Sequence, residues 1–229
     1  TKIDFASVWD VLIRAQASYL FLGWLSYMVI MGACSLRWRI FTVPMGFGQG
    51  IYDLTLYNFA GAFFNLFLPT SLGGDVGRAY YLASHHRDTV HHTGTQGADS
   101  PGLRRAAVSV LADRGMGVVA LMIIASCALY LYPLNASTLP PVFSRVTHIS
   151  TAVLAIAGAL PFFFGDAVKK LGKAAGDLVF YWEHAEILLK AFALSLAIQL
   201  LDVVINIFIG FSLDLNIPIL YYFILTPLT

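Results

Sequence analysis

An acidic and a basic residue stand three positions apart, directly after a pair of glycines. Asp75 and Arg78 follow Gly73 and Gly74 in an otherwise apolar part of the chain. Residues three apart share a helix face and can form an ion pair. The free backbone N–H groups of a helix start also favour an anion, such as a lipid phosphate. We therefore expect an anion site here; the alternative is that Asp75 caps the helix and Arg78 only anchors it.

A second basic residue, Arg114, follows Asp113 and directly precedes a long apolar run. Charged residues at the end of a membrane span commonly anchor it at the interface. The functional interpretation is that Arg114 joins Arg78 in a basic vestibule for lipid headgroups. The sequence leaves both interpretations open.

Four polar residues lie within another apolar stretch at spacings of four, three and four. They are Ser195, Gln199, Asp202 and Asn206, and this spacing places them on one helix face. A polar face inside a membrane helix must point to the bundle interior or to a water-filled cavity. Because Asp202 is ionisable, we expect the face to line a pathway; the alternative is interhelical hydrogen bonding that only holds helices together.

Catalytic and metal-binding patterns are missing from the sequence. It contains no P-loop, no HExxH and no Rossmann fingerprint, and no nucleophile, base and orienting group can be assembled. The histidines 85, 86, 91 and 92 match no established spacing of metal ligands. We expect no catalytic residue, no bound metal and no cofactor.

The composition excludes a soluble domain. Of 229 residues, 58% are hydrophobic and 12% charged, where soluble domains carry about 25% charged residues. Mean hydropathy is +0.73. The net charge of +1 gives no overall field to attract nucleic acid. We expect an integral membrane protein that does not bind nucleic acid.

Apolar runs predict the membrane-spanning segments, since a spanning helix needs about 20 mostly apolar residues. The chain begins at Thr1 without a methionine and stops at Thr229 within an apolar run. We therefore expect residues 1–229 to be a single transmembrane domain that is cut at both ends. The expected spans are residues 15–34, 115–132, 147–165, 188–212 and, as the first part of another span, 217–229.

Residues 52–83 differ from the other apolar runs because they are broken between Pro69 and Gly74. Arginines flank this segment on both sides, and the positive-inside rule places both ends in the cytoplasm. A single crossing cannot have both ends on one side, whereas a hairpin that enters and returns can. We expect an all-α, polytopic bundle with a re-entrant helical hairpin over 52–83; the alternative is an ordinary span with misassigned charges.

Four short sequence blocks follow one another along the chain: Leu36–Arg39, Phe63–Pro69, Gly73–Tyr81 and Ala107–Arg114. This order resembles the lysylphosphatidylglycerol synthase transmembrane family, the flippase-like membrane region of the multiple peptide resistance factor. The match is densest from Leu36 to Gly117. The resemblance implies roles for Asn65, Pro69, Gly73, Gly74, Asp75, Arg78 and Arg114.

The resemblance also implies a bacterial or archaeal membrane and, in the best-known members, lipid translocation. In that family a separate soluble domain makes the aminoacyl-lipid, and these residues do not contain it, so we do not expect synthase activity from them. The expected function is that of a flippase-like protein of the cell membrane. It would handle or translocate an anionic or aminoacylated phospholipid or glycolipid, with a homo-oligomer left open.

Two rival hypotheses remain from the sequence. One is a membrane enzyme or accessory subunit in polyprenyl-phosphate or glycolipid biosynthesis, which a metal-binding carboxylate pair in the cytoplasmic loops would favour. The other is a scaffold that transports nothing, in which loss of charge at Arg78 or Asp202 affects abundance only.

Overall fold

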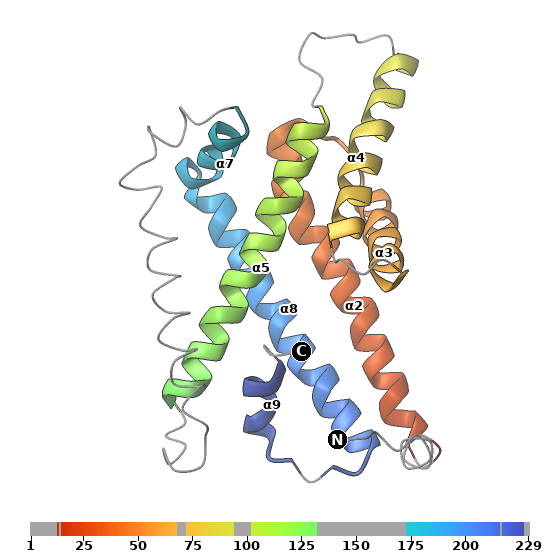
Figure 1. Cartoon of the computed structure of the whole chain (residues 1–229), viewed down its shortest axis with the longest axis vertical. Coiled ribbons are helices and arrows are strands. Elements are labelled where there is room, and N and C mark those ends of the chain that lie inside the picture. The colour runs from red at the N-terminus through yellow and green to blue at the C-terminus, as the bar shows by residue number, and fades with distance from the viewer. Residues whose placement is uncertain are drawn as a thin grey trace.

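Helices make up every regular element in the described part of the chain. The structure is a computed structural model that describes residues 13, 15–67, 72–93, 102–131, 173–215 and 217–226 (Figure 1). The all-helical prediction is confirmed for these residues. The elements are α2 (Ala17–Thr42), the 3₁₀ turn η1 (Val43–Met45), α3 (Ile51–Phe67), α4 (Leu72–Thr93), α5 (Leu103–Leu131), α7 (Lys173–Glu183), α8 (Ala185–Ser212) and α9 (Ile219–Leu225).

Three of these helices are long and apolar enough to cross a membrane. The stretches are Ala17–Met45, Leu103–Cys127 and Ala185–Ser212, and each exceeds the roughly 20 residues that a bilayer core requires. They confirm the prediction of a membrane protein. The span expected at 147–165 lies outside the described residues, and of 217–229 the structure describes one short helix, α9.

Two helices extend beyond the predicted spans, through charged residues at which the prediction stopped. The first span was ended at residue 34, but α2 continues to Thr42 and carries Arg37 within the helix. The next was started at residue 115, but α5 begins at Leu103 and includes Asp113 and Arg114. Arg37 and Asp113 pair with each other inside the protein. This pairing offsets the cost of burying their charges, so neither helix has to end before them.

The long helices α2 and α8 pack against each other most extensively, and α5 contacts both and crosses α8 (Figure 1). The main apolar core lies toward one end, where the C-terminal half of α2 meets α3, α4, α5 and α7. There the Tyr181 hydroxyl of α7 donates a hydrogen bond of 2.7 Å to the Phe41 carbonyl oxygen of α2. Large buried side chains of this core are Trp38, Phe41, Phe47, Leu54, Leu82 and Tyr181.

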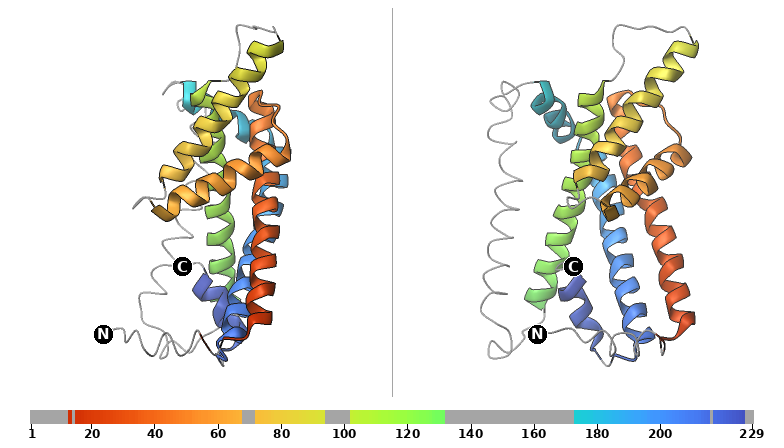
Figure 2. Two further views of the ribbon diagram at one scale, coloured as in Figure 1. Left: turned by 90° about the vertical axis from the view of Figure 1, so that its right-hand side faces the viewer. Right: turned by 45° about the vertical axis from the view of Figure 1, so that its right-hand side comes forward.

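Helices α3 and α4 form an antiparallel pair. The Tyr57 and Tyr81 rings stack with centroids 5.8 Å apart, and the Asn65 Oδ1 atom accepts a hydrogen bond of 2.9 Å from the Gly74 N–H. The C-terminal end of α3 and the start of α4 lie part of the way along α2 and not beyond either of its ends (Figure 2). The structure thus places an antiparallel helix pair over the predicted hairpin, with α4 continuing past residue 83 to Thr93, and re-entry from one side of a membrane stays a prediction.

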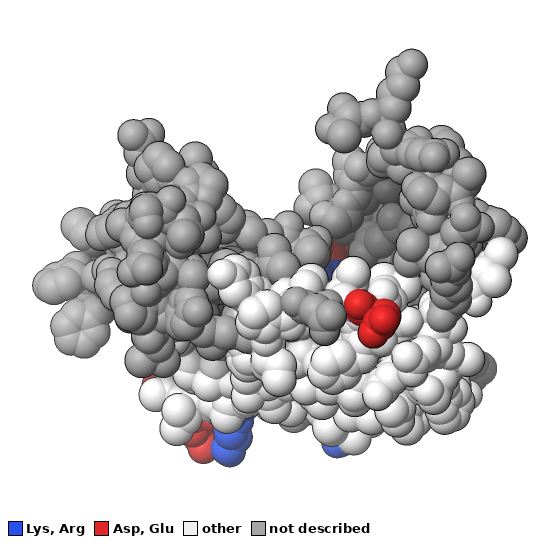
Figure 3. All heavy atoms as spheres, turned by 90° about the horizontal axis from the view of Figure 1, so that it is seen from below, with Lys and Arg blue, Asp and Glu red and all other residues white. Residues whose placement is uncertain are grey.

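The two ends of the bundle differ in charge. At the end that carries α7, Arg104 of α5 pairs with Asp177 of α7, and Arg39 of α2 is exposed. Seen from the opposite end, the described residues present a mostly uncharged surface (Figure 3). Among the described residues, Lys, Arg, Asp and Glu are concentrated toward the end that the positive-inside rule assigns to the cytoplasm.

Candidate functional site

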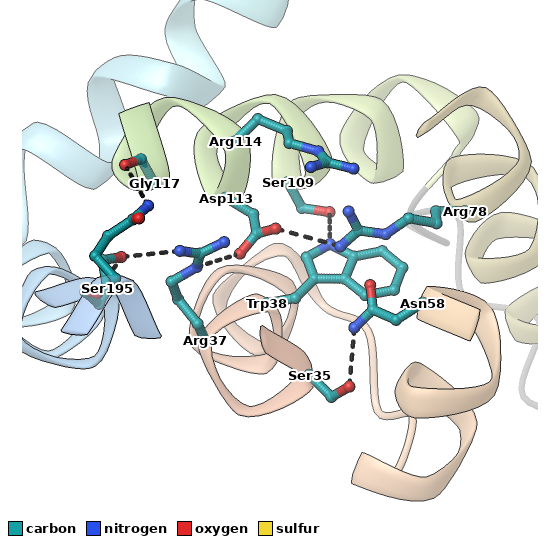
Figure 4. A network of polar contacts seen from close by, with 12 residues as sticks. Ser35, Arg37, Trp38, Asn58, Arg78, Ser109, Asp113, Arg114, Gly117 and Ser195 are labelled. Atoms are coloured by element: carbon teal, nitrogen blue, oxygen red, sulfur yellow. Dashed lines mark hydrogen bonds and ion pairs between the residues drawn. The ribbon is translucent and has the colours of Figure 1, made fainter. Parts of the chain in front are cut away.

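Asp113 of α5 is the centre of a buried charge cluster (Figure 4). Its Oδ1 atom accepts a hydrogen bond of 2.8 Å from the Arg37 Nε of α2, and its Oδ2 atom accepts one of 3.2 Å from the Arg78 Nη2 of α4. Asp113 is only 1% exposed. A buried carboxylate is costly unless it is paired, and here each oxygen has its own guanidinium. One side chain therefore connects three helices.

Arg37 extends this cluster to a fourth helix. Its Nη1 atom donates a hydrogen bond of 3.1 Å to the Ser195 Oγ of α8, and the Ser195 hydroxyl in turn donates to the Ala191 carbonyl oxygen. A Cβ at position 117 of α5 would lie 3.2 Å from the Arg37 Nη1. The glycine at this position gives the guanidinium room to lie between α5 and α8.

Arg78 is held mainly by Asp113 and by an aromatic ring. It is 4% exposed, and its guanidinium carbon lies 4.3 Å from the centre of the Trp38 ring. Its distance to Asp75, from Nη1 to Oδ1, is a long 3.5 Å, and its buried Nε has no hydrogen-bond partner among the described residues. Arg78 thus has N–H donors that its described neighbours use only in part.

Arg114 and Asp75 form the outer edge of the cluster. The Arg114 Nε and Nη2 atoms both donate to the Asp75 Oδ1, at 2.9 and 2.8 Å, and Nε also lies 3.1 Å from Oδ2, so the guanidinium converges mainly on one oxygen. The Arg114 side chain is 51% exposed and that of Asp75 is 20% exposed. The guanidinium that an approaching ligand meets is therefore that of Arg114, whereas the sequence led us to expect both Arg78 and Arg114 to be available.

The charges of the cluster do not balance. Three guanidinium groups, of Arg37, Arg78 and Arg114, face two carboxylates, of Asp75 and Asp113, which leaves one surplus positive charge. Both carboxylates are already shared between arginines. The arrangement can therefore accept one further anionic group, and a phosphate oxygen suits a guanidinium fork.

The start of α4 is less free for an anion than the sequence suggested. One of its unpaired N–H groups, that of Gly74, is taken by the Asn65 side chain. A Cβ on Gly74 would meet the Gly61 carbonyl oxygen and the Asn65 side chain, so the glycine allows α3 and α4 to approach closely. Gly73 lies beside it in the first turn of α4, and Pro69 lies outside the described residues.

The polar face of α8 meets the cluster only in its first part. Ser195 binds Arg37, and the Gln199 Nε2 lies 3.4 Å from the Gly117 carbonyl oxygen of α5. Farther along α8, the Asn206 side chain donates to the Asp202 carbonyl oxygen of its own helix. Within the described residues, no hydrogen bond joins Asp202 or Asn206 to the arginines.

Sequence reasoning missed the site roles of Arg37, Trp38 and Asp113, and it did not predict that Ser195 binds Arg37. Arg37 lies after the end of the first expected span, and Asp113 was considered only as the neighbour of Arg114. The available signal was an arginine and a tryptophan directly after an apolar run, since both side chains need a polar partner when they are buried. The cation–π partner of Trp38 is Arg78 of another helix, which the sequence does not indicate. Among the described residues, no group of three or more His, Cys, Asp or Glu side chains could hold a metal ion.

The helices and the cluster define an integral membrane protein in which charged side chains are buried between packed helices. The chain belongs to the family described as the lysylphosphatidylglycerol synthase TM region, whose family model matches residues 1–229, the whole chain. Among curated proteins and among solved structures, nothing matches. The family is a membrane region of lipid-related proteins, which agrees with the resemblance found in the sequence.

Proposed function

We propose that this chain is a flippase-like protein that handles or translocates an anionic or aminoacylated membrane lipid. The observation that carries the proposal is the surplus positive charge of the arginine–aspartate cluster, exposed at Arg114. A guanidinium can hold a phosphate through two parallel hydrogen bonds. A phosphate at this position would balance the charge of the cluster.

The α3–α4 hairpin supports the proposal if it is re-entrant. Non-helical backbone within a bilayer is tolerated only where it is buried in protein or lines a wet cavity. A hairpin that returns to its own side would carry Asp75 and Arg78 below the membrane surface, where a headgroup must pass. Asp75 is paired with both Arg78 and Arg114 of α5, so these three charges would lie together along that passage.

The polar face of α8 would continue the path of the headgroup beyond the arginines. Ser195 is bonded to Arg37, and Gln199, Asp202 and Asn206 follow along the same helix face. In the proposed function these side chains replace water for a polar headgroup as it moves away from the arginines. The proposal includes no covalent step.

The test is lipid translocation in reconstituted vesicles, with fluorescent phosphatidylglycerol and lysyl-phosphatidylglycerol as probes. Arg114→Gln removes the exposed cation and should abolish most transport, whereas Arg114→Lys keeps the charge without the fork and should retain part of it. Arg104→Gln is the matched control, because Arg104 also lies on α5, is similarly exposed and pairs with an aspartate outside the cluster.

Rates are compared per amount of folded protein. Equal transport by Arg114→Gln and the unaltered chain would overturn the proposal. So would an Arg104→Gln variant that loses as much transport as Arg114→Gln.

A further inference from the structure

We propose that Asp75 is an internal counter-ion, which occupies the guanidinium of Arg114 until a phosphate ester displaces it. This inference rests on the proposed function and specifies the atoms at which a headgroup first binds. The ligand class is a phosphate mono- or diester. The carboxylate holds the place of the phosphate in the unliganded protein.

The two carboxylates of the cluster differ in how firmly they are held. Asp113 is almost fully buried and binds two buried arginines, so it cannot leave without exposing uncompensated charge. Asp75 binds a half-exposed arginine and reaches Arg78 only at 3.5 Å. Part-exposed ion pairs contribute little to stability. The Asp75–Arg114 pair can therefore open while the rest of the cluster stays intact.

A phosphate ester can form more hydrogen bonds at this position than the Asp75 carboxylate does. A phosphate ester presents additional acceptor oxygens, and Arg78 has donors that its described neighbours leave underused. These are Nη1, at 3.5 Å from Asp75, and the buried Nε without a described partner. Arg78 is 96% buried and lies three residues from Asp75 on the same helix. A phosphate bound to Arg114 in place of Asp75 meets a second cation that is already fixed in position.

The exchange predicts a gain of affinity when the counter-ion is removed. In the purified full chain, Asp75→Asn frees the fork of Arg114 and should tighten phosphate-ester binding roughly fivefold, as expected from the loss of one part-exposed ion pair. Binding is measured by isothermal titration calorimetry in detergent. The probes are glycerol 3-phosphate and short-chain phosphatidylglycerol.

Asp177→Asn is a closely matched control. It removes the same charge, Asp177 is 18% exposed against 20% for Asp75, and each aspartate pairs with an arginine of α5. Its affinity for both probes should equal that of the unaltered chain. Asp75→Ser removes the same carboxylate with a different side chain and should show the same gain, in case the asparagine variant does not fold.

The two probes separate the sources of the phosphate. If only phosphatidylglycerol binds more tightly, the ligand is a lipid headgroup. If only glycerol 3-phosphate binds more tightly, the ligand is a soluble ester. If both bind more tightly, the site accepts phosphate esters in general, and each of these results supports the exchange. The inference is overturned if folded Asp75 variants bind both probes equally or more weakly, or if Asp177→Asn gives the same gain.

Failure of the proposed function gives a different result. If Asp75→Asn binds tighter but the unaltered chain moves no lipid in vesicles, the exchange site stands and the flippase proposal fails. If the unaltered chain moves lipid and Asp75→Asn leaves affinity unchanged, the exchange fails and the transport proposal stands.

Discussion

The guanidinium carbon of Arg78 lies 4.3 Å from the centre of the Trp38 ring, so that the face of a fully buried indole supports a buried cation. The indole N–H of Trp38 donates a hydrogen bond of 3.2 Å to the Ser109 hydroxyl of α5. Trp38 thus positions Arg78 on α4 while it is itself fixed by α5. The side chain has two separable roles, a ring face and a hydrogen-bond donor.

Substitutions at Trp38 should separate these roles. Trp38→Phe keeps a ring face and loses the donor, so it should lower the free energy of unfolding by about 1 kcal/mol more than the change in packing alone. Trp38→Leu also loses the cation–π contact and should cost about 3 kcal/mol. The measurement is denaturant unfolding in detergent micelles, with Ser109→Ala as the reference for the hydrogen bond. Equal losses for Phe and Leu would show that the ring face contributes nothing.

The close approach of α3 and α4 should make Gly74 intolerant of a side chain. Gly74→Ala places a Cβ against the Gly61 carbonyl oxygen, and because backbone cannot easily move away, it should destabilise by about 2 kcal/mol. Gly115→Ala on α5 is the control, because nothing lies within 4 Å of its Cβ position. That change should be neutral or stabilise by up to about 1 kcal/mol. Thermal unfolding of both variants checks the prediction, which fails if Gly74→Ala is as stable as Gly115→Ala.

Cysteines on either side of the α3–α4 hairpin should be accessible from the same side of the membrane. Gly48 precedes α3 and Gly102 precedes α5, and both are exposed with open space at the Cβ position. A cysteine at each position, in a chain in which Cys34 and Cys127 are replaced by serine, should react with a membrane-impermeant thiol reagent from the cytoplasmic side. A cysteine at the exposed Leu215, after α8, should react only from the other side.

Opposite-side labelling at positions 48 and 102 would make the segment a simple crossing. The re-entrant hairpin would then be wrong. The depth assigned to Asp75 and Arg78 in the proposed function would also have to be revised.

Asp202 should matter for transport and not for folding. An ionised carboxylate near the middle of a bilayer costs about 3 kcal/mol on insertion scales, so Asp202→Leu should insert at least as well as the unaltered chain. If the polar face of α8 lines a pathway, transport in vesicles should fall several-fold at equal amounts of folded protein. Glu186→Gln, which removes a charge at the exposed start of the same helix, should leave transport unchanged. Unchanged transport in Asp202→Leu would reduce the polar face to a structural role.

The sequence was sufficient to predict the fold class, because the composition and the apolar runs follow directly from burial in lipid. The extent of a helix was harder to predict where a charge lies within it. Arg37 and Asp113 interrupt the apolar pattern, and their mutual pairing, across 76 positions in the chain, explains how each helix continues through its charge. A distant partner of this kind leaves no local signal in the sequence.

The same limit applies to the site. Asp75, Arg78 and Arg114 were singled out from the sequence, and the structure brings them together. The spacing of three predicted an Asp75–Arg78 pair, which the structure contains at 3.5 Å. The shorter contacts of Asp75 and Arg78 are with Arg114 and Asp113 of α5, because the first turns of α4 pack against that helix.

The hydrogen bond between Asn65 and Gly74 closes a short ring of backbone around residues 66–73. The bond joins the two helices directly, from the last turn of α3 to the first turn of α4. The relative position of the two helix ends is therefore set by contacts between the helices themselves, of which this bond and the close approach of Gly74 to Gly61 are part.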